Sequence, residues 1–190
     1  MKALVALCGA IAGLMMMIVG GLIPAAILSP SLDYPSKLIN LPSTWQVPSL
    51  LICSIVCGPR AGVMASTAYL AIGLFQLPVF HDGGNIEYLQ NAGFGYLAGF
   101  IPASWVTGRY SRKKGWNKLP YMTISALYGL GVIHIIGIIN LSIGTLLSRW
   151  PETFLDLLIS YSLAPLPSQI ALCAAVAIIS SIMRVIILVE

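Results

Sequence analysis

The sequence predicts an all-α integral membrane protein that forms a single domain over residues 1–190, a bundle of six transmembrane helices. Three observations predict it. Apolar residues make up 58% of the chain and charged residues 8%, against about 25% charged residues in ordinary soluble domains. Several apolar segments approach or exceed the roughly 20 residues that a membrane-spanning helix needs. The period-two alternation of membrane strands is absent, so every span is expected to be helical.

Six apolar segments are the candidate spans. They are residues 3–28, 45–57, 61–80, 93–108, 119–147 and 157–189. The second is short, with 13 residues, and Pro48 suits the first turn of its helix. In the last segment, Pro165 and Pro167 predict that the membrane helix begins near residue 167. Residues 157–164 are then a shorter lead-in to it.

The distribution of charge predicts the orientation of these spans. With both termini inside, the inner segments hold eight of the ten basic residues: Lys2, Arg60, Arg109, Arg112, Lys113, Lys114, Lys118 and Arg184. Five acidic residues then lie outside: Asp33, Asp82, Glu87, Glu152 and Asp156. Cytoplasmic loops carry the excess of Lys and Arg, so the basic run at 109–118 is interpreted as a cytoplasmic loop and not as a nucleic-acid site. We expect a multi-pass protein of the inner (plasma) membrane, with the polar loop at 81–92 outside.

The sequence offers little for catalysis or metal binding. Cys53 and Cys57 are one helical turn apart, but no His, Asp or Glu lies near them in the sequence, which favours small core residues over a metal pair. His134, the one histidine within a span, is interpreted as a hydrogen-bonded core residue. The chain has no Gly-x-Ser-x-Gly and no Walker sequence. We therefore expect no enzyme activity, no cofactor, no metal and no ATP hydrolysis by this chain.

Small residues recur at four-residue spacing in the first predicted helix. Ala6 pairs with Ala10, and Gly9 with Gly13. Such spacing lets two helix backbones approach closely in a membrane. The pattern is compatible with packing inside this chain and with a surface for a partner or a second copy, and the spacing does not choose between them.

Polar groups gather in the outer loop and recur in two spans. The loop offers Asn85, Glu87, Tyr88 and Asn91 for hydrogen bonding. Tyr96 lies just inside the fourth span and Gln169 near the start of the last membrane helix. A polar residue inside a membrane is usually paired or functional. The alternatives are a solvated loop and interfacial aromatic residues.

Five short motifs follow one another over about sixty residues. They are Gln46-Val47-Pro48, Gly58-Pro59-Arg60, Leu77-Pro78-Val79-Phe80, Gly83-Gly84 and Gly95-Tyr96-Leu97-Ala98-Gly99-Phe100-Ile101-Pro102-Ala103. In this order and spacing the chain resembles the biotin-transporter S-component family (BioY type), the substrate-binding subunits of energy-coupling-factor importers.

The resemblance implies a subunit that captures biotin from the exterior. It implies docking of the first helix, through Ala6, Ala10 and Gly13, on a transmembrane coupling subunit that works with a pair of ATPases. With biotin as the ligand, the chemistry of the side chains makes Asn85, Glu87, Tyr88, Asn91 and Tyr96 the expected substrate-binding residues, and the resemblance adds Gln169, at the position where the family keeps an Asp. Tyrosine faces would cover the biotin rings, and amides, chiefly Gln169 and Asn85, would bind the ureido group.

The chain departs from the family pattern at one place. The family usually carries an Asp, and three residues on a Lys, near the start of its last helix, where this chain has Gln169 and Leu172. Losing both charges together is electrostatically consistent, because an unpaired buried charge is costly. The pocket then either keeps biotin with neutral groups or binds another vitamin or small heterocycle. A ligand-free membrane scaffold, built on the small residues of the first helix, is the third hypothesis.

Single-cysteine variants test the predicted orientation. With Lys2, the 109–118 loop and Glu190 inside, a membrane-impermeant thiol reagent added to intact cells should label Asn85→Cys and Glu152→Cys. It should not label Lys113→Cys. Labelling of Lys113→Cys from outside would mean that either the number of spans or their orientation is wrong.

Overall fold

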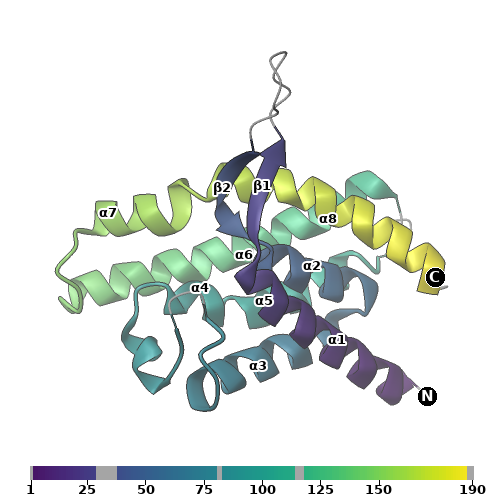
Figure 1. Ribbon diagram of the computed structural model, residues 1–190, viewed down its shortest axis with the longest axis horizontal. Helices are drawn as coiled ribbons and strands as arrows, with labels where there is room; N and C mark the ends of the chain where they lie inside the picture. The colour runs from purple at the N-terminus through teal and green to yellow at the C-terminus, as the bar shows by residue number, and fades with distance from the viewer. Residues whose placement is uncertain (1, 29–37, 81–82, 114–117, 188–190) are drawn as a thin grey trace.

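The computed structural model describes residues 2–28, 38–80, 83–113 and 118–187. Along the chain the elements are α1 (Lys2–Leu22), β1 (Pro24–Leu28), β2 (Leu38–Thr44), α2 (Gln46–Val56), α3 (Pro59–Phe75), η1 (Ile86–Gln90), α4 (Phe94–Ala98), α5 (Phe100–Tyr110), α6 (Leu119–Leu146), α7 (Phe154–Leu158), η2 (Ile159–Leu163) and α8 (Leu166–Ile187) (Figure 1). Glu190, Lys114 of the basic run, and His81 and Asp82 of the outer loop lie outside the described residues.

The helical membrane fold is confirmed. Within the described residues, three helical stretches are long and apolar enough to cross a membrane: Ala3–Leu22, Leu119–Leu146 and Phe154–Ile187. Helix α6 crosses the middle of the molecule and contacts α5, α4 and α8. In Figure 1, α1 begins and α8 ends at the same side of the molecule. This is the arrangement expected for an even number of spans.

The first span is shorter than predicted, and part of it is not helical. Helix α1 ends at Leu22, and β1 pairs antiparallel with β2 to form a hairpin. Pro24 explains the end of the helix, because a residue before proline is driven out of the helical region and proline has no N–H to donate. Pairing with β2 supplies the backbone hydrogen bonds that a helix would otherwise make. The prediction that every span is helical throughout is therefore wrong at residues 24–28.

Later helix limits agree better with the sequence, except that α3 ends at Phe75 and residues 77–79 of the third predicted span are not helical. Pro48 lies in the first turn of α2, and α8 begins at Leu166, as predicted. The fourth span is divided at Gly99 into α4 and α5. A Cβ on Gly99 would lie 3.0 Å from the Cα of Ile133, so glycine allows the division to sit directly against α6.

The small residues of α1 pack inside the molecule, against α2 and α3. Ala10 is only 6% exposed. A Cβ on Gly9 would lie 2.7 Å from the Cβ of Cys57, and one on Gly13 would collide with the Sγ of Cys53. Close approach of helices therefore accounts for Ala10 and Gly13, whereas Ala6 stays half-buried. The burial of Cys53 agrees with its interpretation as a small core residue.

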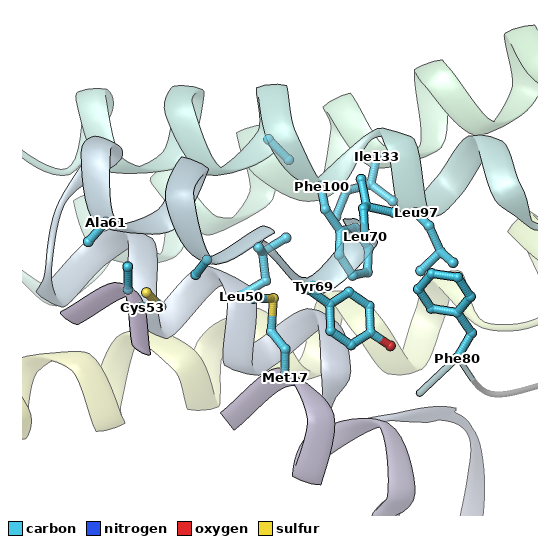
Figure 2. Packing of buried hydrophobic residues seen from close by; sticks show 13 residues of the cluster. Met17, Leu50, Cys53, Ala61, Tyr69, Leu70, Phe80, Leu97, Phe100 and Ile133 are labelled. Atoms are coloured by element: carbon cyan, nitrogen blue, oxygen red, sulfur yellow. The ribbon is translucent and has the colours of Figure 1, made fainter. Parts of the chain in front are cut away.

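The core contains a cluster of three aromatic residues, Tyr69, Phe80 and Phe100. Figure 2 shows Tyr69 beside Phe80 and Phe100. The Tyr69 and Phe80 ring centroids are 5.4 Å apart in an edge-to-face arrangement, and the Tyr69 and Phe100 centroids are 6.4 Å apart. Tyr69 is fully buried, so its hydroxyl needs a partner within the protein.

Two arginines cap the other end of α2. Arg184 of α8 donates from Nε and Nη2 to the carbonyl of Ile55, at 3.2 and 2.7 Å, and Arg112 donates to the carbonyl of Val56 at 3.3 Å. The last carbonyls of a helix have no partner within the helix and carry partial negative charge. These cations supply both the missing donors and the opposite charge, and Arg184 ties α8 to α2.

The packing of α1 predicts opposite effects for two glycine substitutions. Gly13→Ala should lower the midpoint of thermal unfolding in detergent, because overpacking of this kind costs about 1–3 kcal/mol. Gly131→Ala in α6 is the matched control. Apart from its chain neighbours and the nearby backbone of its own helix, no described residue lies within 4 Å of the added Cβ, and alanine favours helix by about 1 kcal/mol. Equal stability of the two variants would contradict the α1 interface.

Candidate substrate-binding site

A cavity of about 190 Å³ lies where β2, η1, α2, α4, α5, α6, η2 and α8 meet. Its lining residues are Ser43, Thr44, Gln46, Val47, Tyr88, Gly93, Tyr96, Leu97, Phe100, Ile133, His134, Tyr161 and Gln169. None of these described lining residues is charged. Polar groups and aromatic faces line the cavity together, which is typical of a site for a small organic molecule.

The first residue of α2 places an amide in the cavity wall. Gln46 is 7% exposed, and its Nε2 donates to the hydroxyl of Tyr69 at 2.8 Å. The Tyr69 hydroxyl in turn donates to the carbonyl of Val79, also at 2.8 Å. Val79 follows α3 in an extended segment whose backbone is not engaged in a helix. The amide is thus held by a buried tyrosine that spans the gap between α2 and this segment.

A second amide is held by a histidine of α6. Nε2 of His134 lies 2.8 Å from Oε1 of Gln169, and Nδ1 lies 3.1 Å from the Oγ of Ser162. The Tyr96 hydroxyl lies 2.6 Å from the same Oγ. One series of hydrogen bonds therefore connects four elements, namely α4, η2, α6 and α8.

Aromatic rings flank this series of hydrogen bonds. Tyr96 and Tyr161 stack with their ring centroids 5.9 Å apart, and Tyr96 meets His134 edge to face at 5.7 Å. Gly137 lies directly under the Tyr96 ring, where a Cβ would collide with the ring. The rings form an apolar wall beside the two amides, which suits a ligand with a polar edge and an apolar body.

The hairpin contributes to the same cavity. Ser43 and Thr44, at the end of β2, are both in its lining. The Oγ of Ser168 in α8 lies 3.0 Å from the Oγ of Ser43. Residues 43 and 44, which lie between the first two predicted spans, therefore border the site.

Three of the six expected substrate-binding residues line the cavity, namely Tyr88, Tyr96 and Gln169. Asn85 and Glu87 are exposed and lie outside the lining. Asn91 is half-buried and also lies outside it.

The two asparagines have roles in the shape of the loop. Oδ1 of Asn85 accepts from the N–H of Ile86 at 2.6 Å, at a residue whose φ is 109°. Oδ1 of Asn91 accepts from the N–H of Gly93 at 2.8 Å. Asparagine tolerates such backbone conformations because its short side chain bonds to nearby backbone groups.

Ten of the thirteen lining residues were not predicted as site residues, and two of these, Gln46 and His134, make the side-chain hydrogen bonds described above. Gln46 was noted only as part of a motif, and His134 only as a core histidine. His134 is hydrogen-bonded as expected of a core residue, and it also lines the cavity. The signal that could have found it is its position inside an apolar span, where polar side chains usually have a purpose.

Comparison with known proteins gives matches over most of the chain. The family model described as the BioY family matches residues 3–187. An uncharacterized 21.2 kDa protein of Cyanophora paradoxa is 35% identical over 141 residues, covering 74% of this chain and 73% of that protein. The biotin transporter BioY of Thermotoga maritima is 32% identical over 103 residues, or 54% of this chain and 60% of the relative.

Two further similarities concern a third relative and the fold. A probable biotin transporter BioY of Lysinibacillus sphaericus is 29% identical, with 60% of this chain and 61% of that protein covered. The match thus spans about three fifths of each named transporter. A crystal structure of the S-component for biotin from an ECF-type ABC transporter superposes with a TM-score of 0.72 at 21% identity, covering 94% of this chain and 90% of that one.

The solved structure confirms the fold, and the family model extends over nearly all of the residues in which the motifs and the cavity lie. The chain belongs to the BioY family, whose members are membrane transport components and not enzymes.

Proposed function

We propose that this protein captures biotin from the exterior, as the substrate-binding subunit of an importer. The observation that carries the proposal is the neutral cavity with two amides, Gln46 and Gln169, beside stacked aromatic rings. Biotin combines a neutral ureido group, which has both donors and an acceptor, with an apolar thioether ring. Amides can meet both kinds of ureido group, and Tyr96 and Phe100 can cover the rings.

The loss of the family's Asp and Lys agrees with this neutral site. Oε1 of Gln169 lies 2.8 Å from Nε2 of His134, and Leu172 is buried in the core. A carboxylate here without its cation would be desolvated and unpaired, which is costly. A neutral pair still satisfies a neutral ureido group. The polar lining also favours a ligand over the alternative of a ligand-free scaffold.

The valerate carboxylate of biotin has no cation among the described lining residues. A charged carboxylate buried without a partner is unfavourable. We therefore place the ureido end deep in the cavity, against the two amides, and leave the carboxylate at the mouth in contact with water.

A second, larger cavity supports docking to an energy-coupling partner. It measures about 350 Å³, lies between α1, α2 and α8, and is lined almost wholly by apolar groups: Leu4, Val5, Cys8, Gly9, Ala12, Gly13, Met16, Ile52, Cys53, Val56, Cys57, Met183 and Ile187. It offers a small molecule such as biotin no polar partner, but an apolar helix fits such a groove. We propose that a transmembrane subunit, coupled to a pair of ATPases, docks here; self-association is the alternative.

This assignment changes which residues of α1 contact the partner. Ala10 and Gly13 pack against α2 and α3, and Gly13 forms part of the groove floor. Ala12 is exposed and lines the groove. Ala6 is half-buried and is not among the residues that line the groove.

The membrane is taken to be the plasma membrane, with the cavity toward the outside. The basic run at 109–113 and Arg60 then lie at the cytoplasmic face, as the positive-inside rule requires. Apolar side chains of α6 such as Ile135, Ile139 and Ile143 are exposed and contact lipid.

Removal of the Gln169 amide should weaken biotin binding. Gln169→Ala deletes one hydrogen bond, worth about 0.5–1.5 kcal/mol net, and leaves His134 with an unpaired nitrogen. We expect about a tenfold loss of affinity in calorimetric titration of the purified protein. Gln76→Ala, an exposed glutamine at the end of α3, should bind as the parent does.

Unchanged affinity of Gln169→Ala would remove this residue from the site. Absence of binding by the parent protein at micromolar biotin would redirect the proposal to another heterocyclic vitamin.

Blocking the apolar groove should separate transport from binding. Ala12→Trp fills the groove, so partner docking and uptake should fall while biotin affinity is kept. Ile139→Trp is the control, because that exposed side chain lies on α6 and outside the groove. Ala10→Trp should instead reduce folded yield, since Ala10 is buried. Normal uptake by Ala12→Trp would rule out docking in the groove.

A further inference from the structure

We infer that hydrogen bonds behind the cavity wall give its two amides opposite polarities. Gln46 presents an acceptor to the ligand, Gln169 presents a donor, and His134 is the positioning residue that sets the second. This inference rests on the proposed function of the cavity, and it names the arrangement of ligand groups that the site selects.

The polarity of Gln46 follows from a fixed end point. The carbonyl of Val79 can only accept a hydrogen bond, so the Tyr69 hydroxyl must donate its one proton there. That hydroxyl can then only accept from Gln46, and the amide nitrogen is the one group of Gln46 that donates. Nε2 is therefore turned toward Tyr69. Oε1 receives no hydrogen bond from the described residues and remains as the acceptor for a ligand.

The polarity of Gln169 follows from the direction in which its amide points. Oε1 faces His134, and an amide oxygen only accepts, so His134 must carry its proton on Nε2. In a neutral imidazole Nδ1 is then bare, and it accepts from the Ser162 hydroxyl. Because the Ser162 hydroxyl already donates its one proton to Nδ1, it can only accept from the Tyr96 hydroxyl. The hydrogen bonds therefore all run the same way, from Tyr96 to Ser162, from Ser162 to His134 and from His134 to Gln169. The amide N–H groups of Gln169 remain for a ligand.

Together the two amides select a particular ligand edge. A group with an N–H beside a C=O, as in a cyclic urea or a lactam, can donate to Gln46 and accept from Gln169. A ligand that presents only donors leaves the Gln169 N–H groups facing other N–H groups. Buried polar groups left unpaired are costly, and sites of this kind discriminate strongly between ligands.

The preference of the cavity for an N–H beside a C=O can be tested with cyclic ligands that differ in these groups. Dethiobiotin keeps the urea, and 2-iminobiotin replaces its oxygen by nitrogen and presents only donors when protonated. The parent protein should bind biotin and dethiobiotin and should bind 2-iminobiotin at least tenfold more weakly. Gln169→Glu replaces the donor by a carboxylate, so it should lose biotin affinity at least tenfold and gain affinity for 2-iminobiotin. Gln76→Glu is the matched control and should change neither. Biotin binding by Gln169→Glu as tight as by the parent would overturn the donor assignment.

The tautomer of His134 can be measured without any ligand. The chain has two histidines, so His81→Gln leaves His134 as the one imidazole signal in a ¹⁵N-labelled sample. The nitrogen spectrum of the folded protein should show a protonated Nε2 and a bare Nδ1. A protonated Nδ1 would overturn the inference, because Gln169 would then have to donate to His134 and offer an acceptor to the ligand.

Ser162, which lies outside the cavity lining, allows a test of the hydrogen bonds that connect Tyr96, His134 and Gln169. Ser162→Ala removes the donor to Nδ1, so the Nδ1-protonated form should become populated and biotin affinity should fall about three- to tenfold. Ser180→Ala is the control, since that buried hydroxyl has no hydrogen-bond partner among the described residues. If the Ser162→Ala protein kept the parent's His134 tautomer and biotin affinity, Ser162 would not set the tautomer, and this part of the inference would be wrong.

These readouts separate the inference from the proposed function. A parent protein that binds biotin but carries the Nδ1 proton keeps the function and overturns the polarity. A parent protein with the Nε2 proton that binds no biotin keeps the polarity, while the biotin proposal fails.

Discussion

A polar group buried in this bundle is costly unless it finds a partner inside the protein, and the site depends on that constraint. Water is scarce among apolar helices, and an unpaired polar group there costs several kcal/mol in the limit of a hydrocarbon environment. Gln46 therefore donates a hydrogen bond to the Tyr69 hydroxyl, and Tyr69 donates one to the Val79 carbonyl. His134 satisfies both ring nitrogens in the same way. Pairing these groups uses one side of each amide and leaves the other side for a ligand.

The same constraint shapes the rest of the bundle. Arg184 supplies donors to the end of α2, and the β1–β2 pairing satisfies a segment that proline excludes from α1. Where no polar group is involved, close packing decides: Gly13 and Gly99 let backbones approach α2 and α6. We propose that function divides between two cavities, a neutral polar one for the ligand and an apolar groove for the partner.

Local features could be predicted from the sequence, and features made by distant contacts could not. Pro48 in the first turn of α2 and the start of α8 depend on nearby residues and were predicted correctly, whereas the first and third predicted spans reach beyond the ends of α1 and α3. The hairpin depends on residues 24–28 meeting 38–44, which apolar content alone does not reveal. Gln46 and Gln169 become neighbours of one cavity through packing of α2 against α8. Asn85 and Asn91 have suitable chemistry for a ligand, but their side-chain oxygens bond to the loop backbone.

A high-resolution structure of the protein with biotin tests the central claim most directly. The account predicts the ureido ring in the cavity between Gln46 and Gln169, with one ureido N–H within hydrogen-bond distance of Gln46 Oε1. The ureido oxygen should lie within about 2.7–3.2 Å of Gln169 Nε2. A ureido oxygen turned toward Gln46, or biotin bound away from both amides, would contradict it.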